Sequence, residues 1–149
     1  MHLLEDRIRK LRIGWNKKAL GEADLYRICR RFHIQVTEMP LRTDGFYYRV
    51  KGRDFIAVNS RLSGPMKLLV LFHELGHFLF HTPESGATAN FHGVGGSVRK
   101  ECEADAFALC SLLPRRMIET RSIDEIADDT GLPEKAIADR FELWRKYGL

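Results

Sequence analysis

Apolar residues recur at helical spacing in several stretches of the chain. In the first stretch, Leu4, Ile8 and Leu11 lie on one face of a helix. Pro65 falls in the first turn of the third stretch, where its missing N–H costs nothing, and Pro114 ends the fourth. These patterns predict helices over residues 3–12, 23–32, 63–80, 98–113, 123–130 and 134–146.

Alternating apolar and polar residues predict strands between the second and third helices. A short strand is expected at 34–37, and two β-like runs follow at 46–50 and 55–58. The turn-like segment 51–54 separates these two runs, which indicates a β-hairpin. Residues 82–97 break the pattern with four glycines and one proline, and a loop of this length suggests a functional flap.

The composition fits one ordinary globular domain. The chain has 149 residues, of which 44% are hydrophobic and 30% charged, so it can bury a core. It has no apolar run approaching the roughly 20 residues that span a bilayer, and its three cysteines are scattered along the sequence. We therefore expect a single domain over residues 1–149 of a cytoplasmic protein, with reduced thiols and no membrane association.

The formal net charge of +4 conceals an uneven distribution. Residues 1–31, a basic and helical N-terminal part, carry nine Lys or Arg and four Asp or Glu. Residues 122–142 carry two basic and seven acidic residues. A basic arm can contact nucleic acid or an acidic partner. We interpret residues 1–31 as a solvated helix face and keep DNA binding through them as an alternative.

The motif His73-Glu74-Leu75-Gly76-His77 falls inside the long apolar helix. Residues 73 and 77 are one turn apart on the same face, so their imidazoles can converge on one metal ion. Glu74 lies about 100° round the helix axis from His73, which suits a carboxylate acting on metal-bound water. Unpaired polar groups are costly to bury, so these side chains need partners. The motif therefore predicts a zinc site with Glu74 as general base.

A zinc site of this kind needs a third protein ligand. The helix predicted at 98–113 offers Glu101 and Glu103, which point about 200° apart, so only one of them can be the ligand. We choose Glu101, because Asp105 then lies one turn along and can accept an N–H from a ligating histidine. Glu103 is otherwise explained as a surface residue, and a thiolate of Cys102 remains a further alternative.

Several segments of the chain share their residues with a known family. They are Asp44-Gly45-Phe46-Tyr47-Tyr48, Ile56-Ala57-Val58-Asn59-Ser60, Phe72-His73-Glu74-Leu75-Gly76-His77-Phe78, Glu101-x-Glu103-Ala104-Asp105-x-Phe107-Ala108 and Leu112-Leu113-Pro114. In this combination, which covers residues 20–115, the chain resembles the ImmA/IrrE family of zinc metallopeptidases. It departs from the family at Leu113, where Met is frequent.

The resemblance implies a gluzincin-like zinc endopeptidase that cleaves a DNA-binding repressor. Carried over by position, it implies that His73, His77 and Glu101 hold Zn²⁺ and that Glu74 is the catalytic base. We therefore expect an α+β, zincin-like metallopeptidase domain. It would have a small twisted sheet with the hairpin at its edge, two zinc-site helices and a C-terminal helical tail over residues 115–149.

Two other functions fit the same sequence. A metal-containing regulatory protein that binds a transcription factor or DNA would need the same three ligands, but it would not need Glu74. The tail has helix-turn-helix spacing with Gly131 in the turn, which is typical of DNA binding. Its second helix, however, carries three acids and two bases, a balance that DNA phosphates disfavour. We expect the tail to pack as a helical hairpin, without direct nucleic-acid contact.

Two further features of a peptidase are left open. The hairpin at 46–58 can present an edge strand to an extended peptide substrate. The tetrahedral intermediate needs a hydrogen-bond donor, and the sequence leaves its candidates unranked: Tyr47, Tyr48, His81, His92 and Arg99.

Overall fold

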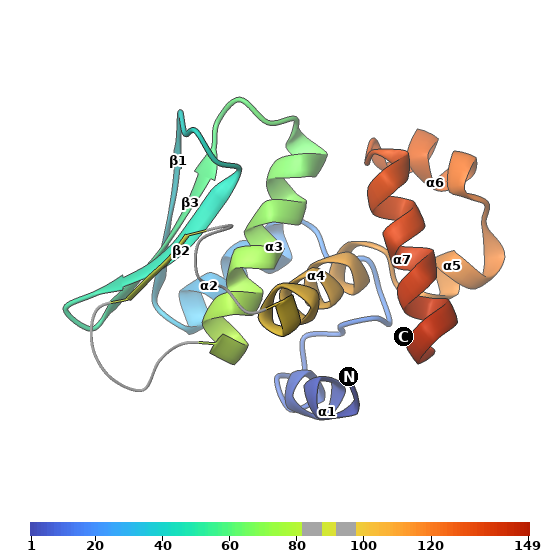
Figure 1. The fold of residues 1–149 in the computed structure, drawn as a ribbon, viewed down its shortest axis with the longest axis horizontal. Coiled ribbons are helices and arrows are strands. Elements are labelled where there is room, and N and C mark those ends of the chain that lie inside the picture. Colours follow the sequence, from blue (N-terminus) through green and yellow to red (C-terminus); the bar gives the residue numbers. More distant parts are fainter. Residues whose placement is uncertain (82–87, 92–97) are drawn as a thin grey trace. The chain divides into compact units, whose positions relative to one another are not determined.

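A computed structural model describes residues 1–81, 88–91 and 98–149 (Figure 1). Its elements confirm the α+β class, and they form two compact units, one of residues 22–108 and one of residues 1–21 with 109–149. The assignment of residues 1–149 to a single domain stays a prediction. Among the helices described, none combines the length and apolar character needed to cross a bilayer. The elements are α1 (His2–Arg9), α2 (Glu22–Arg31), β1 (Ile34–Met39), β2 (Gly45–Val50), β3 (Arg53–Asn59), α3 (Gly64–His81), β4 (Thr88–Phe91), α4 (Val98–Leu112), α5 (Arg115–Thr120), α6 (Ile123–Thr130) and α7 (Glu134–Tyr147).

The sheet has four strands in the order β1-β3-β2-β4. β1 runs parallel to β3, and β2 is antiparallel to both β3 and β4. The predicted hairpin is therefore present, but it lies at the centre of the sheet and not at its edge. The reason is β4, which comes from the segment expected to be a loop and pairs along the outer side of β2. The rest of the expected flap, residues 82–87 and 92–97 with His92, lies outside the described residues.

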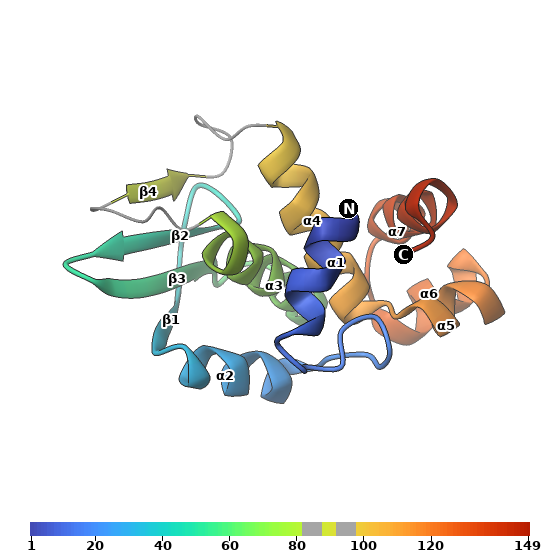
Figure 2. The same ribbon diagram turned by 90° about the horizontal axis from the view of Figure 1, so that it is seen from below.

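Two helices cover the sheet on one side, as both views show (Figures 1 and 2). α3 packs on β2 and β3, and α2 packs on β1 and against α3. Aromatic rings join these layers, since the Phe78 ring of α3 meets Tyr47 of β2 edge-on at 5.8 Å and Phe32 at 5.6 Å. The long helix predicted at 63–80 is thus confirmed, and it forms the central layer of this unit.

Two glycines allow α3 to approach its neighbours closely. A Cβ added at Gly45, where β2 begins, would lie 2.7 Å from Cγ1 of Val70 on α3. A Cβ added at Gly76 would lie 3.2 Å from both Cα of Ala104 and Cδ1 of Phe107 on α4. The middle of α3 is therefore held tightly between the sheet and the first part of α4.

The other unit contains the helices that begin and end the chain. α1 ends at Arg9, earlier than predicted, and Arg12 and Asn16 beyond it have positive φ angles of 55° and 58°. α6 and α7 confirm the two predicted tail helices, and Gly131 joins them with a φ of 71°. α5 was not predicted, because its six residues show little periodicity.

A buried arginine ties this unit together. Arg140 of α7 is 0% exposed and donates to the main-chain oxygens of Leu113, at 2.8 Å, and Leu149, at 3.0 Å. A third bond, of 3.0 Å, goes to Oδ1 of Asn16, which also accepts from the main-chain N–H of Arg115 at 2.8 Å. The guanidinium fork thereby links segments that lie far apart in the sequence.

Candidate metal centre

Three side chains predicted to be metal ligands converge from α3 and α4. Nε2 of His73 lies 3.1 Å from Nε2 of His77, and the Glu101 carboxylate places one oxygen 3.3 Å from each of these nitrogens. Their ligand atoms all lie within 4.8 Å of one another. In a tetrahedral zinc site with bonds of about 2.0–2.1 Å, neighbouring ligand atoms are about 3.3–3.4 Å apart. The two imidazoles and the carboxylate thus fit a zinc ion in chemistry and in spacing.

The environment of His77 favours its neutral form. Burial lowers the pKa of His77, and His73 adds to the effect, while the charges of Glu74 and Glu101 oppose it. A lowered pKa keeps the imidazole neutral at neutral pH. Since a histidine must be neutral to bind a metal, the site is prepared for one.

Glu74 lies on the same turn of α3 as the two histidines and is 1% exposed. Its side chain lies near the start of β2, where a Cβ on Gly45 would be 3.7 Å from Cγ of Glu74. Gly45 therefore leaves room for this carboxylate between the helix and the sheet. A carboxylate here is beside the candidate ligands and is not itself part of the ligand cluster.

Asp105 lies one turn along α4 from Glu101, where the sequence analysis places it. Its Oδ1 is 2.7 Å from Nδ1 of His73, the ring nitrogen that does not face Glu101. This is the arrangement in which a carboxylate accepts the second N–H of a ligating histidine.

Sequence reasoning missed a second arrangement, on the other histidine. Nδ1 of His77 lies 3.0 Å from Nδ1 of His81, and Nε2 of His81 lies 2.9 Å from Oε2 of Glu103. Nε of Arg99 donates to the other Glu103 oxygen at 2.9 Å. Glu103 is therefore not a simple surface residue, whereas Cys102 is exposed and lies outside the ligand cluster. The regular interval of four residues between positions 73, 77 and 81 places all three histidines on one helix face, and this pattern could have identified His81.

The candidates for a transition-state donor lie in different surroundings. The hydroxyl of Tyr47 donates to Oδ1 of Asp54 at 2.6 Å, and the Tyr47 side chain is buried. Tyr48 stacks on Phe55 with ring centroids 4.8 Å apart. His92 lies outside the described residues. His81 and Arg99 belong to the arrangement around Glu103.

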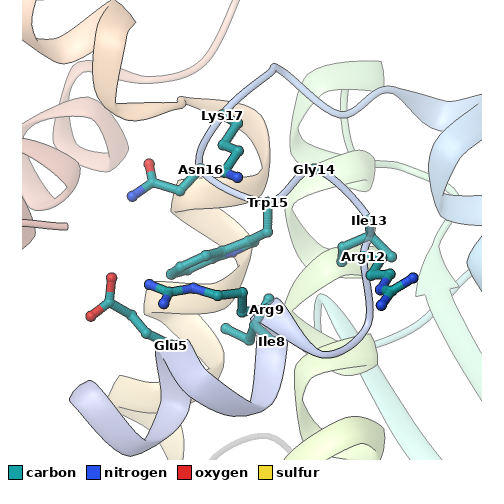
Figure 3. A pocket seen from close by; sticks show the side chains of 9 residues that line it. All are labelled: Glu5, Ile8, Arg9, Arg12, Ile13, Gly14, Trp15, Asn16 and Lys17. Carbon is teal, nitrogen blue, oxygen red and sulfur yellow. The ribbon is translucent and has the colours of Figure 1, made fainter.

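A hollow of about 540 Å³ lies in the other compact unit, between α1 and the loop that follows it (Figure 3). Arg9, Arg12 and Lys17 contribute positive charge to it, and Figure 3 shows the Arg9 guanidinium alongside the Trp15 indole. The hollow gathers part of the basic charge of residues 1–31 but none of the candidate metal ligands. Its lining is completed by Glu5, Ile8, Ile13, Gly14 and Asn16.

Comparison with known proteins places this chain in a family. In Bacillus phage phi105, a protein named uncharacterized immunity region protein 2 is 28% identical to this chain over 115 residues. The similar region covers 72% of this chain and 73% of the phage protein. The profile of the M78 peptidases, described as the IrrE N-terminal-like domain, matches residues 29–143, which include every candidate ligand. The chain therefore belongs to the M78 peptidase family with the IrrE N-terminal-like domain.

Proposed function

We propose that this chain is a zinc-dependent endopeptidase that cleaves a DNA-binding regulatory protein. The observation that carries the proposal is the cluster of His73, His77 and Glu101, with donor atoms at the spacing of zinc ligands and Glu74 on the same helical turn. Two imidazoles and one carboxylate form a ligand set that suits catalytic zinc and leaves a position for water or substrate.

Each residue has a separate part in the proposed reaction. When bound, zinc would lower the pKa of a coordinated water to about 7 and polarise the scissile carbonyl. His73, His77 and Glu101 would hold the ion. The Glu74 carboxylate accepts a proton from the attacking water and passes it to the leaving amine. Asp105 accepts the outer N–H of His73 and so fixes the tautomer of that ring.

Two lines support a regulatory protein as the substrate. The phage relative takes its name from an immunity region, and the resemblance to the ImmA/IrrE family implies a repressor. The sheet offers one means of binding such a substrate. Because β4 takes the outer side of β2, an extended peptide would add along β4 and not along the hairpin.

The proposal can be tested by co-expressing the chain with repressors, beginning with any encoded beside its gene. Wild type, Glu74→Gln and the matched control Glu134→Gln, at an exposed glutamate of α7, would be compared. We expect fragments of the repressor with wild type and with Glu134→Gln. Glu74→Gln should give no fragments while retaining about one zinc per chain, because the three ligands remain.

The same experiment separates the peptidase from a non-proteolytic regulator. A regulator that binds a transcription factor or DNA needs the metal ligands but not a general base. If wild type and Glu74→Gln relieve repression equally without producing fragments, the binding role is correct. Equal fragmentation by both proteins would show that Glu74 is not the base.

A further inference from the structure

His81 lies at the end of α3, one turn beyond His77, and its side chain is 4% exposed. It contacts the candidate metal centre through His77 and reaches Glu103 on α4 through its other ring nitrogen. The Glu103 side chain is 17% exposed, and that of Arg99, which binds it, is 79% exposed. A continuous chain of polar contacts thus leads from a buried candidate ligand to the surface.

The direction of the hydrogen bonds along this chain follows from the chemistry of imidazole. A neutral imidazole carries one N–H, so it donates through one nitrogen and accepts through the other. With a metal ion held between Glu101 and the two histidines, Nε2 of His77 would bind the ion and carry no proton, so the proton of His77 would lie on Nδ1. His77 therefore donates to Nδ1 of His81, and this places the His81 proton on Nε2. Nε2 of His81 then donates to the Glu103 carboxylate.

Glu103, the last residue in this series of contacts from His77, is suited to accept the hydrogen bond from His81. Nε2 of His81 lies 2.9 Å from Oε2 of Glu103, and Nε of Arg99 donates to Oε1 of Glu103 at 2.9 Å. The Glu103 carboxylate, paired with the Arg99 guanidinium, is therefore an acceptor with both of its oxygens engaged. A charged acceptor orients the His81 ring, and the His81 ring orients His77.

We propose that His81 and Glu103 are positioning residues that fix His77 in the tautomer and ring orientation needed to bind zinc. This inference rests on the function proposed above. The two glutamates then have different roles: Glu101 faces Nε2 of His77, whereas Glu103 acts on Nδ1 of His77 through His81. Without His81, the Nδ1 proton of His77 would lose its acceptor, and the ring would lose one of the contacts that set its orientation.

Three variants test the proposal by removing different parts of the hydrogen-bonded arrangement. His81→Phe keeps a planar ring and removes both hydrogen bonds. His81→Asn restores an acceptor close to the position of Nδ1, and Glu103→Gln keeps an acceptor for His81 but removes the charge. His2→Phe, at a side chain that is 94% exposed, is the matched control.

The readouts are zinc affinity, measured by competition with a chromogenic chelator, and the visible spectrum of the cobalt-substituted protein. Thermal unfolding of the metal-free protein reports whether each variant folds. We expect His81→Phe to weaken zinc binding about 10–100-fold and to alter the cobalt spectrum. His81→Asn should recover most of the loss, Glu103→Gln should fall between them, and His2→Phe should match wild type.

Two results would overturn the inference. One is a folded His81→Phe protein with wild-type zinc affinity and cobalt spectrum. The other is a folded His81→Asn protein that binds zinc as weakly as His81→Phe. If His81→Phe does not fold, Glu103→Gln decides, since wild-type affinity and spectrum there contradict the role of the carboxylate. A wild-type chain that binds no zinc would instead refute the proposed function itself.

Discussion

The two histidines of the candidate site are supported in different ways. Nδ1 of His73 meets the Asp105 carboxylate directly at 2.7 Å, and that side chain is 62% exposed. Nδ1 of His77 lies 3.0 Å from Nδ1 of His81, so it reaches the carboxylate of Glu103 only through the His81 ring. One branch is short and open to water, whereas the other is long and buried.

This contrast in exposure determines which of the two contacts water can replace. If Asp105 is lost, solvent at the same position can accept the N–H of His73 at little cost. If His81 is lost, a buried donor on His77 has no such substitute, and an unsatisfied buried group is destabilising. We therefore expect the buried branch to matter more to zinc binding than the exposed one.

The largest effect is expected at the point where both branches meet. Glu101→Ala removes the carboxylate that faces both Nε2 atoms. Zinc affinity should fall by more than the roughly 10–100-fold loss typical of residues behind the ligands. Competition with a chelator measures this loss. A smaller effect than that of His81→Phe would show that Glu101 is not a ligand.

Gly76→Ala disturbs both branches together, because α4 carries the acidic residues of each. The added Cβ would lie 3.2 Å from atoms of Ala104 and Phe107, and overpacking of this kind costs about 1–3 kcal/mol. Chemical denaturation of the metal-free protein measures the free energy of unfolding. Gly64→Ala is the control, since a Cβ there meets nothing within 4 Å. Equal stability of the two variants would contradict the close approach of the helices.

Asp105→Asn tests the exposed branch alone. The amide keeps an oxygen that can accept from His73, and solvent can take the place of the lost charge. The loss of zinc affinity should be about tenfold or less, at the lower end of the range for such residues. Measured beside His81→Phe, it should be the smaller of the two losses. The reverse order would refute the contrast between the branches.

The smallest effect is expected at Arg99, where the buried branch reaches the surface. Its ion pair with Glu103 involves an arginine side chain that is 79% exposed, and exposed pairs contribute little. Arg99→Ala should change zinc affinity by less than about twofold, because His81 still binds Glu103. A tenfold loss would mean that the charge of Arg99 holds the whole branch in place.

Local sequence spacing was sufficient for the parts of the site that lie within one helix. His73 and His77 are one turn apart on a helix whose apolar run and Pro65 mark it clearly. Glu101 and Asp105 follow the same rule on α4. Each of these four residues lies where a single helical wheel places it.

The parts that were missed depend on contacts between distant segments. A helical wheel gives the direction of Glu103 from the axis of α4, but it does not show how α4 crosses α3. Three histidines spaced by four residues extend about 12 Å along a helix, so a second carboxylate of α4 reaches the far end of the row. The place of β4 beside β2 is likewise a pairing between segments far apart in sequence.

The most direct test of the account is anomalous diffraction at the zinc edge from crystals of the zinc-loaded protein. We expect one strong peak, about 2.0–2.1 Å from Nε2 of His73, Nε2 of His77 and a carboxylate oxygen of Glu101. A peak beside other residues would contradict the proposed ligands. So would the absence of a peak between α3 and α4 in protein shown to contain zinc.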